Sequence, residues 1–391
     1  MVKRNVIVAA LGTTQTLAWG SSYYLPAILA EPIAEGLGVS RALVFGVFSG
    51  SLLLSALLGP AVGRAIDNRG GRGVLVLSNV VLAAGLVLLA FAHGVVSLAV
   101  AWAVLGVGMA LGLYDSAFAT LAGLYGRAAR GPITGITLIA GFASTIGWPL
   151  SAFLDVILGW RGTCLTWAVL HLLIGLPLNR LLIPRAAPPE RTAEPEVSAP
   201  ASPRGTMAIL AFVFAAAWFV TGAMAAHMPR LLEIAGATST AAIAASALVG
   251  PAQVAARLVE FGALRWISPL VSARIAAALH PLGAGILAAF GAPAIMAFAL
   301  FHGAGNGLLT IAKGTLPLAI FGPVGYGLRS GVLAAPARAA QAASPLIFGL
   351  LIDWLGVGAL AISSGLSIAA LLALMGLRAR TSPAAAVPSR A

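Results

Sequence analysis

Apolar stretches long enough to cross a lipid bilayer recur along the whole chain, separated by short clusters of Gly, Pro and charged residues. A helix needs roughly 20 largely apolar residues to cross the hydrocarbon core. Twelve segments meet this requirement, six in each half of the chain. They cover about 6–30, 41–64, 73–92, 95–123, 132–156, 162–183, 206–230, 238–262, 270–291, 293–319, 327–350 and 356–378. We therefore predict an all-α membrane protein with twelve transmembrane helices.

The composition agrees with this class and excludes several others. Hydrophobic residues make up 60% of the chain and charged residues only 9%. The formal net charge of +12 is expected from loop topology, so we predict no nucleic-acid binding. Cys164 is the only cysteine, which rules out an intramolecular disulfide and any multi-cysteine metal site. The chain carries no nucleotide-binding Gly-rich loop and no catalytic triad, so we expect neither an enzyme nor a cofactor.

The segment between the sixth and seventh spans, "PRAAPPERTAEPEVSAPASPRG", has the composition of a disordered linker. It divides the chain into a bundle over 1–183, a linker over 184–205, and a bundle with a short tail over 206–391. Short matches such as "GPAVGRAID" and "GPAQVAARLVE" relate the two bundles and indicate pseudo-symmetry.

Basic residues gather on one side of the twelve-span topology, which predicts that side to be cytoplasmic. We therefore place both termini and the linker in the cytoplasm, and the protein in a plasma membrane, or an inner membrane if it is bacterial. We expect a monomer that binds a small molecule within the lipid bilayer. The residues that support this orientation are Arg69, Arg72, Arg127, Arg130, Arg185, Arg191, Arg204, Arg265, Arg329, Arg378, Arg380 and Arg390.

The loop after the second span reads "GRAIDNRGGR", with Gly63, Asp67, Gly70 and Arg72 at characteristic spacing. Gly63 permits close helix contact, and Asp67 can cap or pair at a helix end. This loop resembles the signature loop of the major facilitator superfamily, with Asn68 and Gly71 in place of usual basic residues. The resemblance implies the major facilitator fold and secondary transport by alternating access.

A narrower resemblance concerns the first two spans and the eighth. "SSYYLPAILAEPIAEGLGVSR" is similar to the monocarboxylate transporters and the oxalate/formate exchangers. In that group an Arg of the eighth helix meets the substrate carboxylate, and Arg257 matches it. An Asp often precedes that Arg by four residues, but this chain has Gln253, which cannot titrate. Exchangers of the group also carry a basic residue in the eleventh helix, where this chain has Arg338.

Five ionisable residues lie inside predicted spans, where each needs a partner or water. Arg257 either snorkels or pairs with Glu260 at i+3, or it contacts substrate. Arg338 is either a substrate contact or part of an ion pair. Asp115 and Lys313 occupy similar heights in opposite halves, which permits a buried salt bridge, or a titrating Asp115.

Other polar and aromatic residues complete the predicted substrate site. Gln253, Gln341, Asn306 and Lys313 supply polar groups, and Tyr23 and Tyr24 supply aromatic faces; each of the aromatics could instead be a packing residue. The histidines His171, His227, His280 and His302 have no mutual metal-ligand spacing and lie mostly near span ends, so we predict no metal site.

These features predict a secondary transporter for a small organic anion, most simply a carboxylate, with Arg257 and Arg338 as its anchors. Transport by proton symport through Asp115 or Glu260, and exchange of one anion for another, both fit. The alternative is a proton-coupled efflux antiporter for lipophilic or cationic drugs, in which the two acids bind the cation. A receptor or assembly factor is a third class, but only the linker is long enough for a partner site.

Overall fold

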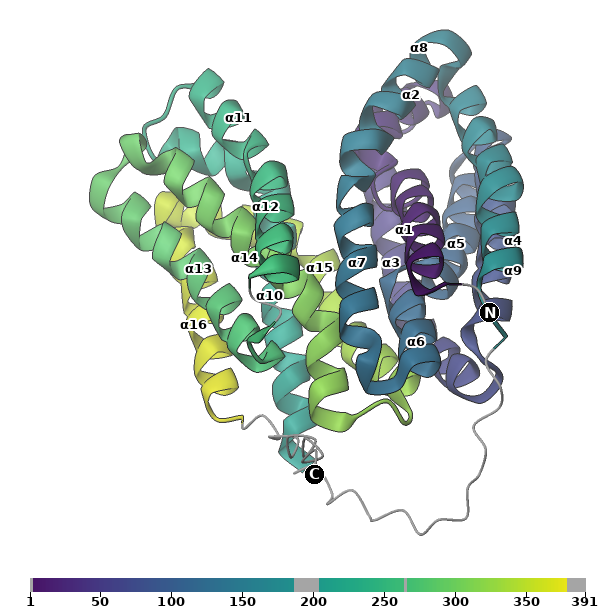
Figure 1. The fold of residues 1–391 in the computed structure, drawn as a ribbon. Coiled ribbons are helices and arrows are strands. Elements are labelled where there is room, and N and C mark those ends of the chain that lie inside the picture. The colour runs from purple at the N-terminus through teal and green to yellow at the C-terminus, as the bar shows by residue number, and fades with distance from the viewer. Residues whose placement is uncertain (1–2, 186–203, 264–265, 378–391) are drawn as a thin grey trace, which may run out of the picture.

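The computed structural model describes residues 3–185, 204–263 and 266–377, and these residues form helices and short connections (Figure 1). Most of the predicted linker, together with Arg191, Arg265, Arg378, Arg380 and Arg390, lies outside the described residues. The described parts before and after the linker are called the N-terminal half (3–185) and the C-terminal half (204–377).

The N-terminal half contains helices that correspond to the first six predicted spans. These are α1 (Arg4–Ser21), α2 (Pro26–Leu37), α3 (Arg41–Arg69), α4 (Gly71–Ala90), α5 (Val95–Gly112), α6 (Tyr114–Tyr125), α7 (Arg130–Ile139), α8 (Ala143–Leu170) and α9 (Leu176–Leu182), with 3-10 turns η1 (Gly126–Ala129) and η2 (Ala140–Phe142) and a π-helical turn η3 (His171–Gly175).

The C-terminal half supplies the other six spans with fewer breaks. Its helices are α10 (Arg204–Ile234), α11 (Ser239–Ala247), α12 (Val249–Gly262), α13 (Pro269–Phe290), α14 (Ile295–Phe321), α15 (Tyr326–Leu355) and α16 (Ala359–Met375). The prediction of twelve spans in two six-helix bundles is confirmed, because each predicted span coincides with one helix or with consecutive helices.

Several predicted spans are broken within their length. The first span ends as α1 at Ser21 and resumes at Pro26 as α2, because Pro lacks the amide proton that a continuous helix needs. The fifth and sixth spans run together in α8, which turns at Gly159, where φ is 69°. Consistent with such merging, eight helical stretches of the described chain are long and apolar enough to cross a membrane, and some of them contain more than one span.

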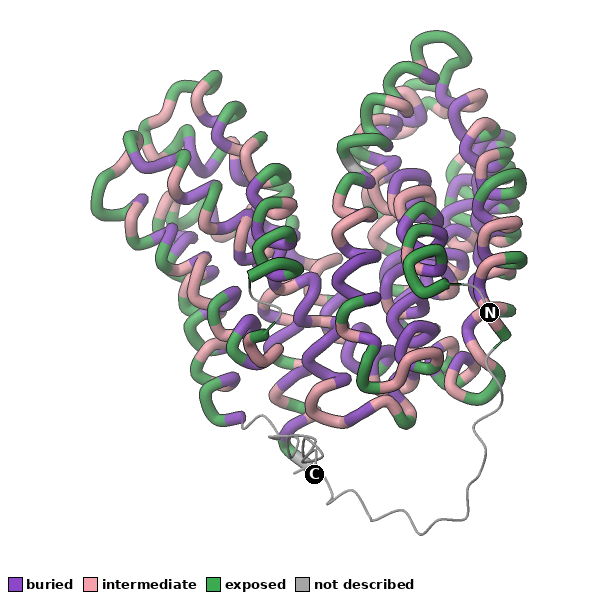
Figure 2. Tube along the Cα trace, viewed as in Figure 1, coloured by how far each residue is buried: buried purple, intermediate pink, exposed green. Residues whose placement is uncertain are grey.

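Figure 2 shows exposed and buried residues alternating along most helices of both bundles. Many of the exposed residues are large and apolar, whereas glycines lie where helices cross. Val156 is 86% exposed and Trp354 80% exposed, which suits contact with lipid rather than water. Inside, the Cα of Gly106 faces the backbone of Ser51 so closely that a Cβ would overlap it. In lipid there is no hydrophobic driving force between helices, so membrane helices commonly associate by close packing at glycine and other small residues.

The two halves meet at the end of the molecule where α9 ends and α10 begins, which we call the linker end (Figure 1). Towards the opposite end, the ribbons of the two halves diverge. Helix α15 of the C-terminal half packs along α3 and α6 of the N-terminal half, and α12 and α14 pack against α7. The polar residues that join the halves therefore lie between these helices.

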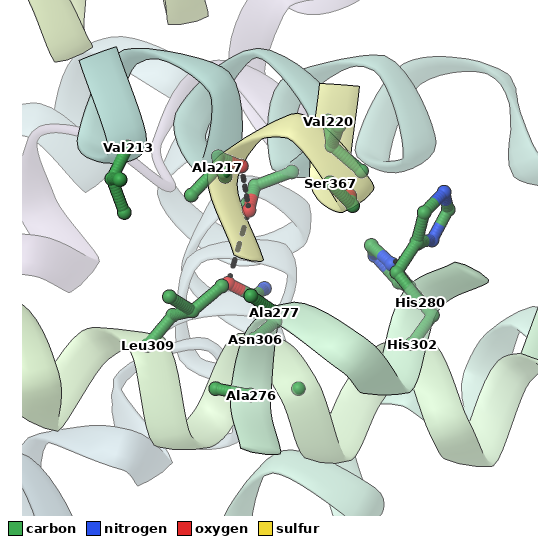
Figure 3. Close-up of a pocket in the computed structure, with 13 residues that line it drawn as sticks. Val213, Ala217, Val220, Ala276, Ala277, His280, His302, Asn306, Leu309 and Ser367 are labelled. Atoms are coloured by element: carbon green, nitrogen blue, oxygen red, sulfur yellow. Dashed lines mark hydrogen bonds between the residues drawn. The ribbon is translucent and has the colours of Figure 1, made fainter. Parts of the chain in front are cut away.

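A separate cavity lies within the C-terminal half (Figure 3). It is bounded by α10, α13, α14 and α16, and its polar lining includes His280, His302, Asn306, Thr221 and Ser367. The apolar clusters of this half lie on either side of the cavity, so the polar side chains that line it depend on one another for hydrogen bonds.

Candidate functional site

The signature loop joins the halves at the linker end. Both oxygens of Asp67 accept hydrogen bonds from the first turn of α15, from the backbone N–H of Gly327 and of Leu328, each at 2.8 Å. A carboxylate at a helix N-terminus satisfies free N–H groups and complements the helix dipole. Gly63 lies directly against Gly327, and Gly59 against Gly331. In contrast, Gly70 and Arg72 act within the N-terminal half, where Arg72 donates to the Arg180 carbonyl.

We expect Gly63→Ala to prevent this close contact, because a Cβ at Gly63 would overlap the carbonyl oxygen of Gly327. Gly50→Ala, in the same helix, is the matched control, since no other group lies within 4 Å of its Cβ position. Cys164 is buried and should stay unlabelled, so a cysteine introduced at buried Ala334 reports opening of the linker end. Gly63→Ala should raise thiol labelling of that cysteine about tenfold over Gly50→Ala, and equal labelling would contradict the contact's role.

Asp115 binds two cations of the opposite half. Its Oδ1 lies 2.8 Å from Lys313 Nζ, and its Oδ2 lies 2.8 Å from Arg338 Nη2. The three side chains are only 9–13% exposed. Arg338 also donates through Nη1 to the Ser55 hydroxyl of α3. In this conformation the carboxylate held by Arg338 is therefore the protein's own, and the three residues form an ion cluster that joins the halves.

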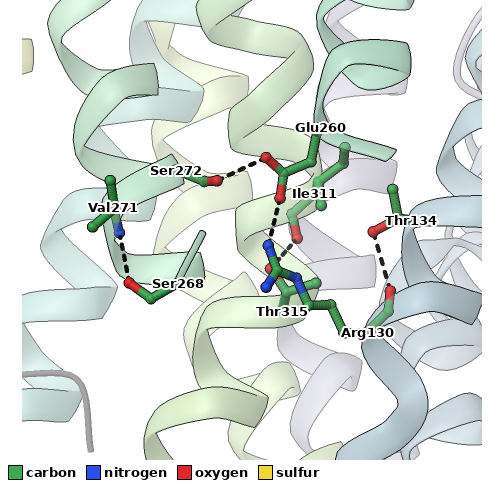
Figure 4. A network of polar contacts seen from close by, with 8 residues as sticks. All are labelled: Arg130, Thr134, Glu260, Ser268, Val271, Ser272, Ile311 and Thr315. Carbon is green, nitrogen blue, oxygen red and sulfur yellow. Dashed lines mark hydrogen bonds and ion pairs between the residues drawn. The ribbon is translucent and has the colours of Figure 1, made fainter. Parts of the chain in front are cut away.

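Glu260 pairs with Arg130 rather than with Arg257, so the i+3 pairing considered from the sequence is wrong (Figure 4). Its Oε1 lies 3.0 Å from Arg130 Nη2, and its Oε2 accepts from the Ser272 hydroxyl at 2.7 Å. The reason is direction: the Glu260 side chain reaches α13 and α7, whereas Arg257 reaches α14 and a different part of α7. Glu260 is 2% exposed and also joins the halves.

Arg257 is a buried cation whose recorded partners are all neutral. It is 6% exposed, so it does not snorkel to the headgroups. Its Nη1 lies 3.4 Å from the Thr137 carbonyl of the N-terminal half, and its Nη2 lies 3.3 Å from Gln253 Oε1 and 3.5 Å from Thr310 Oγ1. These contacts are long, and Nε has no hydrogen-bond partner. Within the described chain, no carboxylate pairs with Arg257.

The N-terminal half supplies room and aromatic faces beside Arg257. Gly141 in η2 lies against Nη1, where a side chain would displace the guanidinium. In the same half, the rings of Tyr24 and Tyr114 pack on Trp19, at centroid distances of 5.9 and 5.0 Å. Among the described residues, the buried Trp19 Nε1 has no hydrogen-bond partner. The N-terminal half thus contributes a cluster of aromatic rings with a free donor.

The remaining predicted site residues divide between this region and the C-terminal half. Gln341 Nε2 donates to the Tyr23 hydroxyl at 2.6 Å, which joins the halves next to the aromatic cluster. Gln253 accepts from Arg257 as described. Asn306 instead lies in the cavity of the C-terminal half, where its Oδ1 accepts from Thr221 at 3.1 Å.

The prediction that the histidines lie mostly near span ends is wrong for His280 and His302. Their Nδ1 atoms are 3.1 Å apart, both residues are buried, and they lie well inside α13 and α14. Sequence spacing cannot reveal a pair that is formed by two adjacent antiparallel helices. Among the described residues, no group of three or more His, Cys, Asp or Glu side chains is placed to hold a metal ion.

Several residues of this region were not predicted from the sequence, among them Arg130, Thr137, Gly141, Thr310, Trp19 and Tyr114. Arg130 was interpreted only as a loop residue that sets topology. The sequence does indicate that Glu260 needs a cationic partner, because a buried acid is costly without one, and Arg130 fills that role. Backbone carbonyl contacts such as that of Thr137 leave no mark in the sequence.

Comparison with known proteins places this arrangement in a family. Residues 11–290 match the sequence profile of the Major Facilitator Superfamily. No curated protein matches the sequence. Among solved structures, the human organic anion transporter MFSD10 (TETRAN) is similar with a TM-score of 0.74 and 16% identity, covering 96% of this chain and 100% of that one.

Two other solved structures are similar over nearly their whole length. FucP in the outward conformation has a TM-score of 0.73 and 14% identity, covering 94% of this chain and 97% of that one. The proton:xylose symporter XylE bound to 6-bromo-6-deoxy-D-glucose has a TM-score of 0.75 and 16% identity, with 95% of each chain covered. At these identities the likeness concerns the fold. Together with the profile match over most of its length, it shows that this chain is a multi-pass membrane transporter of the Major Facilitator Superfamily.

Proposed function

We propose that the protein transports a small organic anion, most simply a carboxylate, by alternating access around Arg257. The observation that carries this proposal is the buried Arg257 guanidinium, which has only neutral partners and an unfilled Nε donor. A buried cation without a counter-charge is costly, so an anion that binds there stabilises the occupied protein. The planar guanidinium can bind a carboxylate through two parallel hydrogen bonds.

The charge balance between the halves supports an anionic substrate. The buried and half-buried charged residues that join the halves include four cations, Arg130, Arg257, Lys313 and Arg338, and three carboxylates, Asp67, Asp115 and Glu260. Asp115 and Glu260 already have cationic partners, and Asp67 accepts from backbone N–H groups of α15. The surplus is therefore positive, and it favours a solute with negative charge.

The position of Arg257 suits alternating access. It contacts Thr137 and Gly141 of the N-terminal half, and Gln253 and Thr310 of the C-terminal half. Any rocking of the halves must change these contacts, so a bound anion can favour one conformation over another. The aromatic rings of Tyr24 and Tyr114 would cover the apolar body of the solute.

Arg338 and Lys313 have a different role in this proposal. In the present conformation both bind Asp115, and they become available to the anion only when the halves separate at the linker end. Exchange of Asp115 for the substrate carboxylate would then link substrate binding to the conformational change. Proton symport and anion exchange are both compatible with this scheme.

The alternative of a cation efflux pump finds less support. It requires Asp115 or Glu260 to bind a cationic drug, but Asp115 lies between Lys313 and Arg338, and Glu260 binds Arg130. A cationic ligand at either acid would first have to displace an internal cation.

The proposed topology follows from the same features. We infer two domains joined by the predicted linker, with the linker end and both termini in the cytoplasm, because the basic loop residues gather there. We also infer a monomer in the plasma membrane, or the inner membrane of a bacterium, since the proposed site lies within one chain.

A ligand screen by thermal unfolding tests the proposal. A ligand that binds only the folded state stabilises it by about 2.7 kcal/mol at a concentration a hundred times its Kd. The purified protein is mixed with small carboxylates (acetate, lactate, oxalate and benzoate), with inorganic anions, and with cationic dyes. We expect a rise in Tm with at least one carboxylate. A rise with cationic dyes alone would contradict the anion proposal and favour efflux.

A further inference from the structure

The buried His280–His302 pair in the C-terminal half is not used by the proposed anion site. His280 Nδ1 lies 3.1 Å from His302 Nδ1, and His280 Nε2 lies 3.0 Å from the Ser363 hydroxyl (Figure 3). Ser363 in turn donates to the Leu360 carbonyl at 3.1 Å. Three helices, α13, α14 and α16, thus contribute to one hydrogen-bonded chain inside the bundle.

Two proton arrangements satisfy this chain. We assign the Ser363 proton to the Leu360 carbonyl, so that Ser363 accepts from His280 Nε2–H and His280 Nδ1 accepts from His302 Nδ1–H. In the reverse arrangement Ser363 donates to His280 Nε2, and the His302 proton lies on Nε2. In the assigned arrangement the free ring nitrogen of His302 is an acceptor. His302 Nε2 is left as a bare acceptor, and this atom has no hydrogen-bond partner within the described residues.

His302 Nε2 belongs to a side chain that lines the cavity, although His302 is only 4% exposed. Asn306, one turn further along α14, also lines it, and its side-chain amide lies 3.1 Å from the Thr221 hydroxyl. The imidazole of His302 and the amide of Asn306 therefore border one polar space, which suits a water molecule that delivers a proton.

No carboxylate faces this pair. The titratable group that faces each imidazole is the other imidazole, and the residues that line the cavity include no charged side chain. Helix α16 carries no titratable residue, and Arg274 of α13 donates to the Leu374, Met375 and Leu377 carbonyls. The other charged or titratable side chains described on α14 and on the helices that pack on α13 and α14 contact groups other than the two imidazoles. They are Arg257 and Glu260 of α12, His227, Arg230 and Glu233 of α10, Tyr326, Arg329, Arg338 and Asp353 of α15, Tyr114, Asp115 and Tyr125 of α6, Arg130 of α7, and Lys313 of α14.

A polar face of α14 connects the pair with the proposed anion site. His302, Asn306 and Thr310 follow one another at i, i+4 and i+8, so they share one side of the helix. The Thr310 hydroxyl donates to the Asn306 carbonyl at 2.9 Å and contacts Arg257 Nη2. Eight residues of helix place His302 about 12 Å along the axis from Thr310.

We propose that His302 Nε2 is a proton-binding site that couples proton movement to anion transport. The proton arrives through the cavity and binds the bare Nε2 lone pair; no bond other than that to its carrier water breaks. The added positive charge is repelled by Arg257, and an anion on Arg257 removes that repulsion. Thr310, which contacts Arg257, lies about 12 Å from His302 along α14; for charges at that separation and an effective dielectric constant near 20, removal of the repulsion raises the proton affinity of His302 roughly tenfold. Anion and proton therefore bind together, as symport requires. This inference rests on the proposed anion site.

The test compares two modes of transport in proteoliposomes made with the full-length protein, using radiolabelled oxalate and lactate as probes. Accumulation driven by a pH gradient requires net proton movement, whereas counterflow at equal pH does not. We expect His302→Gln to lower the ratio of gradient-driven accumulation to counterflow at least tenfold, and His280→Gln to lower it as well. The control is His227→Gln, which removes the imidazole that contacts the Pro345 carbonyl in the same half and should leave the ratio unchanged. Unchanged ratios in both His302→Gln and His280→Gln would overturn the inference.

A second readout does not depend on transport. The ¹⁵N NMR spectrum of the imidazoles, recorded on the protein in lipid nanodiscs, reports which nitrogens carry protons. We expect one imidazole protonated at Nδ1 with a bare Nε2, absent from His302→Gln, which gains a proton at Nε2 on acidification. If the imidazole signal that His302→Gln removes showed a protonated Nε2 throughout, the assignment would be contradicted. If the wild-type protein binds no carboxylate, the anion proposal fails, and this spectrum still decides the proton site.

Discussion

Arg257→Gln is expected to abolish carboxylate binding and transport. The variant removes the buried charge that lacks an acidic partner, and with it two charge-assisted hydrogen bonds to the substrate, each worth about 1.5–3 kcal/mol. The sum corresponds to a loss of affinity of at least a hundredfold. The measurement is the Kd of the best carboxylate in the thermal-unfolding screen, followed by uptake into proteoliposomes.

Two further variants separate substrate binding from folding. Arg257→Lys keeps the charge but loses the paired donors, so we expect weaker binding with Tm close to wild type. Gly141→Ala leaves Arg257 in the sequence but places a methyl group against its guanidinium, so binding should weaken here too. Gly131→Ala is the matched control, because the position of its Cβ is free of neighbours within 4 Å. If Arg257→Gln folds and still binds the carboxylate with wild-type affinity, Arg257 is not the anion site.

Asp115→Asn is expected to destabilise the protein strongly. It leaves Lys313 and Arg338 buried beside each other without a counter-charge, and breaking a buried pair on one side costs about 3–5 kcal/mol. Lys313→Gln should cost less, because the Asp115–Arg338 pair remains. The measurement is the Tm of the detergent-solubilised variants without ligand.

The ion cluster joins the halves, so Asp115→Asn should also open the linker end and increase labelling of a cysteine at Ala334. In the double variant Asp115→Asn/Lys313→Gln, part of the lost stability should return, since one unpaired cation is gone. If Asp115→Asn were as stable as Lys313→Gln and equally closed to labelling, the cluster would not hold the halves together.

The sequence predicted the fold well because the bilayer imposes a length and polarity on each span. The apolar segments, and the Gly, Pro and charged residues between them, located the helices, and the Gly63–Arg72 loop indicated the family. The breaks were harder to predict. Pro26 indicates one, but Gly159 looks like any other glycine of an apolar helix, and its positive φ depends on how the fifth and sixth spans pack.

The site was predicted only in part, because burial of a charge identifies a residue but not its partner. The cost of burial singled out Asp115, Arg257, Glu260, Lys313 and Arg338 from the sequence alone. Which of them meet depends on the arrangement of helices from opposite halves, about 130 positions apart for Arg130 and Glu260. Local spacing suggested Arg257 for Glu260, and the tertiary packing gave it Arg130.

In the proposed function, a carboxylate crosses the membrane bound to Arg257. The most direct measurement is uptake of the radiolabelled carboxylate into proteoliposomes that contain wild-type protein or Arg257→Gln. The proposed function predicts saturable uptake by the wild type, competition by unlabelled carboxylate, and uptake by Arg257→Gln no higher than in empty liposomes. Saturable uptake by Arg257→Gln equal to wild type would contradict it, as would a wild type that moves cationic dyes but no carboxylate.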